Sequence, residues 1–206
     1  MSHRHGDVGR FSAWAPTYDR HYLQRRVFEP VQKAVLDLAI AEVAQPHAIL
    51  DVGCGTGRLL RAAAQRFPGA RLEGIDAAEG MIEQARSQGG DARFQVGSAE
   101  HLPFEAASFD LVFSTMTFHH WDDQRTGIAE IARVLKPAGR WLLADFIATG
   151  PMRLFFAAFR PRRFHERSDL DKMLGSCGLR VTAARRVPGL WGQITAVAIG
   201  HPLQSA

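Results

Sequence analysis

The sequence predicts an α/β protein built on a doubly wound, mostly parallel sheet with helices on both faces. Short apolar runs alternate with helical segments between residues 48 and 146, and the first of these runs ends in a turn rich in glycine. Two further β-rich runs follow near the C-terminus, at 179–186 and 191–200. Alternation of strand and helix places parallel strands side by side and helices over the faces of the sheet.

The N-terminal part of the chain is predicted to be helical. Val31, Val35 and Leu38 lie on one helical face after Pro30, which favours a helix over about 29–43. A shorter helix is expected before it, over about 12–23. The first ten residues are polar, lack the apolar segment of a secretory signal, and are expected to fray.

The run Ala48 to Val52 carries β-branched residues and is too short for an independent helix, so it is read as a buried strand. Gly53, Gly55 and Gly57 follow it at alternate positions. Glycine permits positive φ and lets backbone N–H groups approach a ligand closely. The helix after the turn directs its positive dipole end to the same place. This spacing therefore predicts a site for a nucleotide-like cofactor.

The rest of the α/β body follows the same logic. A helix over 123–135 is predicted from the inward face formed by Ile128, Ile131 and Leu135. Ser168 is placed to cap a later helix, which Gly178 ends. The remaining strands are expected at 71–75, 92–96, 109–114 and 139–146. Together with the first strand and the C-terminal pair, they make a sheet of seven strands.

Composition limits the class of protein. A chain of 206 residues with 46% hydrophobic residues can bury one sizeable core. No stretch reaches the roughly 20 apolar residues needed to cross a bilayer. The two cysteines, Cys54 and Cys177, suggest neither a disulfide framework nor a metal site, which fits a reducing cytoplasm. The net charge of +4 indicates only a nonspecific attraction to anionic partners. No base-stacking motif is visible, so a nucleic-acid partner is disfavoured.

The spacing of the glycines distinguishes two cofactor classes. Dinucleotide folds carry G-x-G-x-x-G, whereas this turn reads G-x-G-x-G and has Arg58 where the third glycine of that motif would fall. An oxidoreductase that uses NAD is therefore disfavoured. Asp76 ends the second predicted strand, where its carboxylate can accept hydrogen bonds from a ribose diol in either class.

Four segments together resemble the class I S-adenosylmethionine-dependent methyltransferases. Within that superfamily, they are most similar to the small-molecule branch that includes the ubiquinone and menaquinone methyltransferases. They read ILDVGCGTGR at 49–58, LEGIDAAEGMIEQAR at 72–86, GSAEHLPFEAASFDLVFSTMTFHHW at 97–121 and EIARVLKPAGRWLLADF at 130–146. The resemblance implies a Rossmann-like sheet of seven strands that closes with an antiparallel C-terminal pair. It implies S-adenosyl-L-methionine as cofactor and S-adenosyl-L-homocysteine as product.

The resemblance also implies roles for individual residues. Asp51 resembles the acid that braces the turn and the methionine amino group, and Asp76 resembles the ribose diol acceptor. The alternatives are that Asp51 only caps the turn, that Asp76 only caps the following helix, and that the glycines form a turn without a ligand. Met81 resembles the apolar residue beside adenine, with core packing as the alternative. The remaining cofactor contacts that the resemblance implies are Tyr18, Cys54, Ala77, Ser98, Ala99 and Ser114.

One position departs from the family pattern. Family members commonly carry Gly-Asp after the third strand, where the aspartate accepts a hydrogen bond from the adenine amine; this chain has Gly97 and Ser98. Ser98 can accept a hydrogen bond but brings no charge. Adenine recognition could instead rest on the backbone near Ala99, on Glu100 or on packing.

His119 and His120 form the only pair of histidines near the expected site. An imidazole that titrates near neutral pH could take a proton from a phenol, a thiol or an activated carbon, and His119 is the preferred candidate. The alternative is that these histidines cap a helix and pack. A methyltransferase that works by positioning its reactants needs no general base.

Two variable segments are expected to select the substrate. The helical region 1–45 is interpreted as a lid, in which Tyr18 and Asp19 resemble a pair that family members place over the cofactor, with packing as the alternative for Tyr18. Residues 46–206 form the methyltransferase domain, with a substrate-cap insertion at 149–167 that combines apolar residues and arginines. Such a segment suits a hydrophobic or anionic small molecule or a membrane surface, or is a solvated arginine face.

The sequence therefore predicts an enzyme that transfers a methyl group to a small, hydrophobic or anionic organic acceptor by direct displacement. The alternative is a noncatalytic S-adenosylmethionine-binding or interaction protein on the same fold. The identity of the acceptor, the atom that is methylated and the oligomeric state do not follow from the sequence.

Overall fold

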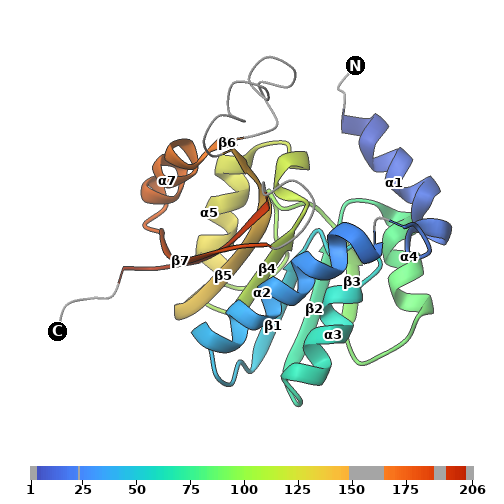
Figure 1. The fold of residues 1–206 in the computed structure, drawn as a ribbon, viewed down its shortest axis with the longest axis horizontal. Coiled ribbons are helices and arrows are strands. Elements are labelled where there is room, and N and C mark those ends of the chain that lie inside the picture. Colours follow the sequence, from blue (N-terminus) through green and yellow to red (C-terminus); the bar gives the residue numbers. More distant parts are fainter. Residues whose placement is uncertain (1–3, 23, 149–164, 188–193, 203–206) are drawn as a thin grey trace.

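The computed structural model describes residues 4–22, 24–148, 165–187 and 194–202. Their main feature is a mixed sheet with the strand order β3-β2-β1-β4-β5-β8-β7, in which β8 and β7 run antiparallel to their neighbours (Figure 1). The strands are β1 (Ala48–Val52), β2 (Arg71–Asp76), β3 (Arg93–Val96), β4 (Phe109–Thr115), β5 (Leu135–Ala148), β7 (Arg180–Arg186) and β8 (Ile194–Gly200). The predicted seven-stranded, mostly parallel fold with an antiparallel C-terminal pair is confirmed.

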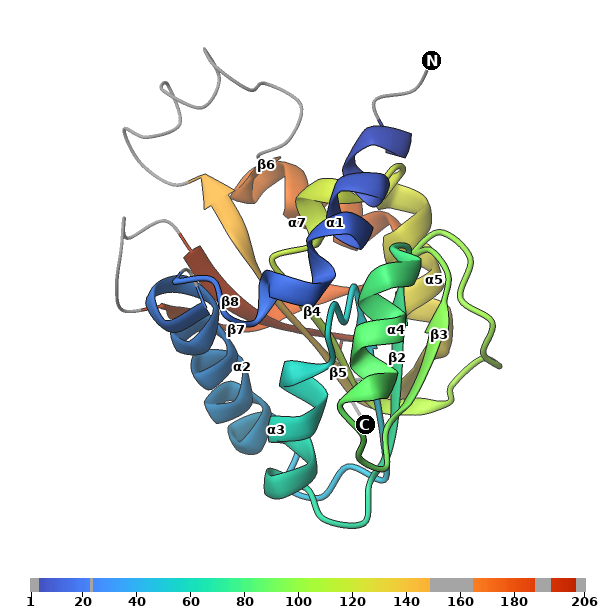
Figure 2. The ribbon, with the colours of Figure 1, turned by 90° about the vertical axis from the view of Figure 1, so that its right-hand side faces the viewer.

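Helices cover both faces of this sheet (Figure 2). The buried side chains of α2 and α3, with Ile82 and Ala85 of α4, share one apolar cluster with the sheet, and those of α5 and α7 share a second cluster on the opposite face. The helices are α2 (Glu29–Glu42), α3 (Arg58–Arg66), α4 (Glu79–Ser87), α5 (Gln124–Val134) and α7 (Arg167–Ser176). The parallel strands are consequently buried on both sides, which accounts for their continuous apolar runs.

Several predicted boundaries differ from the structure. The strand predicted at 139–146 is longer, because β5 begins at Leu135 directly after α5 and pairs irregularly with β4 between Phe109 and Leu111. A two-residue strand, β6 (His165–Glu166), pairs with the end of β5 and was not predicted. It is too short to carry a period-two pattern in the sequence.

The first helix is also displaced from its prediction. Helix α1 spans Arg4–Tyr18 instead of 12–23, and it contains Pro16. Its first half is polar, so no apolar periodicity marks its beginning in the sequence. Turn hydrogen bonds from Arg20 and His21 to the carbonyls of Thr17 and Tyr18 follow the helix, and a short π-helix, η1 (Gln24–Phe28), leads into α2.

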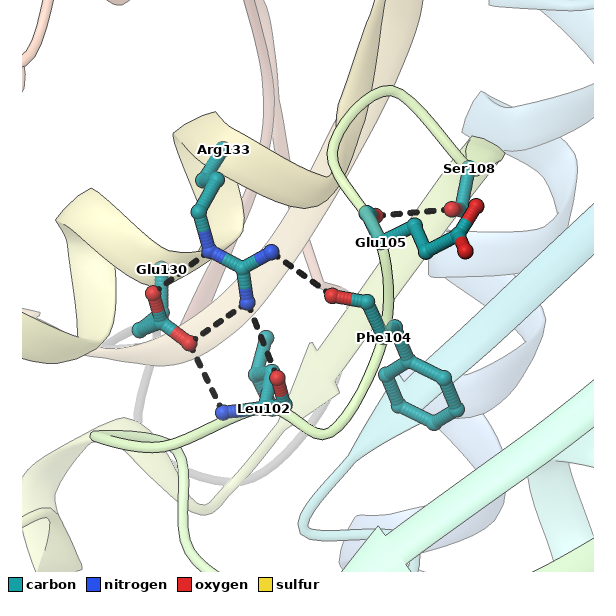
Figure 3. A network of polar contacts seen from close by, with 6 residues as sticks. All are labelled: Leu102, Phe104, Glu105, Ser108, Glu130 and Arg133. Atoms are coloured by element: carbon teal, nitrogen blue, oxygen red, sulfur yellow. Dashed lines mark hydrogen bonds and ion pairs between the residues drawn. The ribbon is translucent and has the colours of Figure 1, made fainter.

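A polar network fixes the long segment between β3 and β4 (Figure 3). The Arg133 guanidinium on α5 donates to the carbonyls of Leu102 and Phe104, at 2.8 and 2.6 Å, and is paired with Glu130. Glu130 in turn accepts the N–H of Leu102 at 2.8 Å. Charge-assisted bonds of this kind are stronger than neutral ones, so α5 holds the loop that begins with Ser98 in a defined position.

Candidate functional site

The glycine turn connects β1 to α3 at the carboxyl edge of the sheet. Gly53, Gly55 and Gly57 all have positive φ, at 78°, 53° and 77°. The N–H groups of Gly53 and Cys54 both donate to the carbonyl of Ile75, at 2.8 and 3.1 Å, so the turn is held against β2. Positive φ at three alternate positions explains why this segment must be rich in glycine.

Two carboxylates lie beside this turn because of strand pairing. Asp51 on β1 is in register with Gly74 on β2, and Asp76 lies two residues further along β2 on the same face of the sheet. Asp76 accepts the N–H of Gly55 through Oδ2 and the N–H of Ala78 through Oδ1, each at 2.8 Å. Asp76 therefore connects the glycine turn to the residue before α4. The N-cap position of α4 is Ala78, without a side-chain cap, so the structure does not show Asp76 as the N-cap that one predicted alternative named.

Asp51 is almost fully buried, with 1% of its surface exposed, and its Oδ1 has no hydrogen-bond partner among the described residues. Burial, together with a smaller effect of the Asp76 charge, raises the pKa of Asp51 to about 8. Burial also raises the pKa of Asp76. A buried acceptor without a partner is costly unless a ligand completes it. A cation such as the α-ammonium group of an amino acid has the charge and donors that this position lacks.

Space for a ligand lies next to Gly55. A Cβ placed on Gly55 would meet no atom within 4 Å, whereas a Cβ on Gly53 would overlap the side chain of Thr117, with 2.6 Å between the two Cβ atoms. The glycine turn therefore touches the β4–α5 segment on one side and is open on the other. The combination of an open backbone turn, a ribose-type acceptor and an unpartnered buried carboxylate fits S-adenosylmethionine.

Helix α1 packs beside α4 at the same edge of the sheet (Figure 2). Asp19, just after α1, accepts hydrogen bonds from Thr56 Oγ1 in the glycine turn and from Gln88 Nε2 after α4, both at 2.7 Å. Met81 is buried against Tyr18 and the rest of α1. Burial raises the pKa of Tyr18 to about 12, and the charge of Asp76 contributes to the rise. Tyr18 and Met81 thus meet near Asp76. The packing of Met81 agrees with its core-packing alternative, and the lid role of the α1 region stays a prediction.

The segment after β3 offers less for adenine recognition. Ser98 is half-buried and its carbonyl accepts the N–H of His101, while the side chain of Ala99 is buried in the core. Glu100 Oε1 already accepts the N–H groups of Asp122 and Asp123, at 2.7 and 3.0 Å. Glu100 therefore connects this loop to the β4–α5 segment. Of the polar side chains predicted to recognise adenine, Ser98 remains the candidate.

Three residues that were predicted to contact the cofactor, Ser114, Cys54 and Ala77, differ in where their side chains lie. The Ser114 hydroxyl is fully buried, donates to the Phe113 carbonyl and accepts the Trp141 indole N–H at 3.2 Å. The Cys54 thiol packs under the turn towards Gly74, and burial raises its pKa well above the usual range. Ala77 is exposed. At Ser114 and Cys54, the side chain is buried in the protein, so a contact of these side chains with a cofactor is not favoured.

The two histidines lie in a 3-10 helix, η2 (Phe118–His120), directly after β4. His119 Nδ1 is 2.7 Å from Oδ1 of Asp145 on β5, and the His119 backbone N–H donates to Oδ2 of the same carboxylate at 3.3 Å. The His120 ring is tilted by 43° against that of His119, with 4.0 Å between the ring centroids, and meets the ring of Phe11 on α1 edge to face at 5.2 Å. Sequence reasoning did not identify Asp145, which is 26 residues from its partner.

No described group of three or more histidine, cysteine or acidic residues is arranged to hold a metal ion. Within the same described residues, no helix is both long and apolar enough to cross a membrane. Most of the predicted substrate-cap insertion, 149–164, lies outside the residues that the structure describes. The site is therefore defined by the glycine turn, the two carboxylates, the α1 region and η2.

Comparisons with known proteins agree on one family. Residues 50–143 match the methyltransferase domain family. The chain is 36% identical over 187 residues to the malonyl-acyl-carrier-protein O-methyltransferase of Geobacter sulfurreducens, covering 82% of this chain and 68% of the relative. It is 36% identical over 158 residues to the demethylmenaquinone methyltransferase of Deinococcus radiodurans, covering 73% of this chain and 64% of the relative.

Solved structures show the same fold. The geranyl diphosphate C-methyltransferase of Streptomyces coelicolor, determined with Mg²⁺, geranyl diphosphate and S-adenosyl-L-homocysteine, superposes with a TM-score of 0.69. The match covers 83% of this chain and 81% of that chain at 15% identity. At this level of identity, the likeness concerns the arrangement of strands and helices.

Proposed function

Because this chain belongs to the S-adenosylmethionine-dependent methyltransferases, we propose that it transfers a methyl group to a small, hydrophobic or anionic organic acceptor by direct displacement. The observation that carries this proposal is the pair of carboxylates beside the open glycine turn, of which Asp51 is buried and its Oδ1 lacks a partner among the described residues. The two reported relatives are named for methyl transfer, which disfavours the alternative of a noncatalytic binding protein.

We assign the cofactor contacts from this geometry. Asp51 takes the methionine ammonium, Asp76 takes the ribose hydroxyls, and the backbone of Gly53, Gly55 and Gly57 lines the methionine and ribose. Around this core, Tyr18 and Met81 cover the cofactor from the α1 side, Ser98 and Ala99 lie near adenine, and Cys54, Ala77 and Ser114 contribute through the backbone. These roles combine the contacts within the structure with the family resemblance.

When bound, S-adenosylmethionine supplies an activated methyl group on a positively charged sulfur. The chain has to hold the acceptor in line with that methyl group and keep water away from it. Positioning alone can contribute roughly 7–11 kcal/mol to lowering the barrier. We propose that the N-terminal segment 1–45 provides a lid, of which α1 lies over the site, and that 149–167 within the 46–206 domain forms the wall that selects the acceptor.

A direct test combines binding with turnover. Isothermal titration calorimetry should give micromolar dissociation constants for S-adenosylmethionine and S-adenosylhomocysteine and no binding of NAD. Purified protein with labelled S-adenosylmethionine should then methylate members of a panel of quinols, phenols and hydrophobic acids. Binding without any turnover would support a noncatalytic protein, and absence of binding would refute the proposal.

The unusual state of Asp51 predicts that binding of the cofactor depends on pH. Asp51, with a pKa of about 8, holds a proton in the free folded protein at pH 6, and the ligand ammonium favours the ionised carboxylate. Binding should therefore release about one proton at pH 6, and the affinity for S-adenosylhomocysteine should rise by up to about tenfold per pH unit until about pH 8. Calorimetry in buffers of different ionisation enthalpy measures both quantities.

The same protonation affects stability in the free protein. An unfolded aspartate ionises near pH 4, so between about pH 4 and pH 8 the folded state binds the extra proton, and the Asp51 contribution to stability is lost as pH rises. Asp51→Asn should remove this dependence and also the proton release. Asp169→Asn, an exposed carboxylate on α7, is the matched control and should change neither. A dissociation constant that does not vary with pH would show that Asp51 does not receive the ammonium.

A further inference from the structure

The position of Asp145 follows from the alternation of side chains along β5. Trp141 and Leu143 belong to the apolar cluster on the α5 side of the sheet, and Asp145 continues that row. Phe118, the first residue of η2, belongs to the same cluster. Only 2% of the surface of Asp145 is exposed, so a buried carboxylate lies within hydrogen-bond distance of His119.

The hydrogen bonds of Asp145 determine the state of the His119 ring. Oδ1 accepts the N–H of Phe146 at 2.7 Å and lies 2.7 Å from His119 Nδ1, while Oδ2 accepts the backbone N–H of His119. An ionised carboxylate only accepts hydrogen bonds, so this contact favours the form of the His119 ring that carries a proton on Nδ1, and a neutral ring in that form has its lone pair on Nε2. The titratable groups in contact with this ring include Asp145 from β5 and His120 from η2.

The location of the ring connects it to the cofactor site. Thr117, two residues before His119, packs against Gly53 of the glycine turn. His120, the next residue, contacts Phe11 of α1. Beyond Asp145, β5 ends at Ala148, where the segment interpreted as the substrate cap begins. His119 therefore lies between the cofactor turn, the α1 region and the start of the variable segment, with 13% of its side chain exposed.

We propose that Asp145 is a positioning residue that holds His119 with its proton on Nδ1, and that Nε2 of His119 takes a proton from the methyl acceptor. The acceptor is then a weakly acidic phenol or enol, and a carboxylate, which is already ionised, would not need this pair. This inference rests on the proposed methyl transfer. His119 accepts the proton as the acceptor forms its new bond to the methyl carbon; the electrons of the broken carbon–sulfur bond stay on sulfur, and His119 later releases the proton to water.

The first test needs neither substrate nor turnover. In protein labelled with ¹⁵N-histidine, long-range proton–nitrogen spectra distinguish the two neutral forms of the ring. His119 should show a protonated Nδ1, and Asp145→Asn should shift it towards the form that is protonated at Nε2. Assignment uses His119→Gln, which keeps the backbone bonds of Asp145. A protonated Nε2 in the unchanged protein, or spectra that do not respond to Asp145→Asn, would overturn the proposal.

The second test uses a series of substituted phenols together with octanoate, an acceptor without a dissociable proton at neutral pH. His119→Gln should lower kcat by about 10²- to 10⁴-fold for phenols that are neutral at the assay pH, and much less for phenols that are already ionised. Asp145→Asn should reproduce this pattern more weakly. His47→Gln, an exposed histidine on the opposite edge of the sheet, is the control and should not change kcat.

The possible outcomes separate this inference from the proposed function. Equal losses across the phenol series, methylation of octanoate alone, or methylation of no phenol by protein that binds S-adenosylhomocysteine would each overturn the inference and leave the proposed function standing. Absence of S-adenosylhomocysteine binding would overturn the proposed function instead. Dissociation constants of the two variants that stay within about twofold of the unchanged protein would show that the site is intact.

Discussion

Replacing Asp76 with alanine is expected to weaken the binding of S-adenosylhomocysteine at least about 100-fold. The carboxylate holds the N–H groups of Gly55 and Ala78, and we assign it the ribose hydroxyls as well. Hydrogen bonds to a charged group contribute about 1.5–3 kcal/mol each, and loss of two such bonds from the complex exceeds the 2.7 kcal/mol that corresponds to 100-fold. Calorimetric titration measures the change directly.

A matched control separates a binding role from a merely structural one. Asp110 also accepts two backbone N–H groups, those of His47 and Ala48, but at the opposite edge of the sheet, and it pairs with Lys136. Asp110→Ala should lower the free energy of unfolding, measured with urea, without changing the affinity for S-adenosylhomocysteine. If Asp76→Ala lost stability to a similar degree and still bound the ligand normally, Asp76 would only hold the glycine turn and the residue before α4 in place.

The parts of the site that could be predicted from the sequence are those set by local chain geometry. A strand that ends in alternating glycines specifies a turn with positive φ, and a carboxylate at the end of the next parallel strand must lie close to it. For this reason, Asp51, Asp76 and the glycine turn are together in the structure. Tyr18 and Met81 pack together, which was the alternative for each, and the predicted bounds of the first helix were wrong.

The parts that could not be predicted depend on which face of a strand a residue occupies and on pairing across the sheet. Ser114 precedes the histidine loop closely in sequence, yet its position in β4 directs the hydroxyl to Trp141 in the core. Asp145 looks like an ordinary polar residue near the end of a strand. Its importance appears only when β5 lies beside β4 and the carboxylate comes within 2.7 Å of His119. A buried acid in an apolar strand is the one signal that could have identified it.

Alanine substitutions at Gly53 and Gly55 are expected to differ in their main effect, on stability at Gly53 and on ligand binding at Gly55, although both glycines have positive φ. An alanine in the left-handed region costs about 1–2 kcal/mol. At Gly53, the added Cβ would also overlap the Thr117 side chain, and overpacking costs about a further 1–3 kcal/mol. Gly53→Ala should therefore lower the free energy of unfolding by about 2–5 kcal/mol in urea denaturation.

The Gly55→Ala variant should fold but lose its ligand. Its Cβ meets no protein atom within 4 Å, so the loss of stability should be limited to about 1–2 kcal/mol for the backbone conformation. The same Cβ would occupy the space that we assign to the cofactor, so affinity for S-adenosylhomocysteine should fall tenfold or more. Unchanged affinity in Gly55→Ala would place the ligand elsewhere.

The overlap at Gly53 can be tested separately from the backbone strain. Thr117→Gly removes the side chain that the new Cβ would meet, so in the Gly53→Ala background it should recover at least about 1 kcal/mol of stability, while in the unchanged protein it should be neutral or destabilising. A double-mutant cycle isolates this coupling. Coupling would show that contact between the glycine turn and the β4–α5 segment, which also carries His119, is part of what defines the site. Strictly additive effects would show that the two segments are positioned independently.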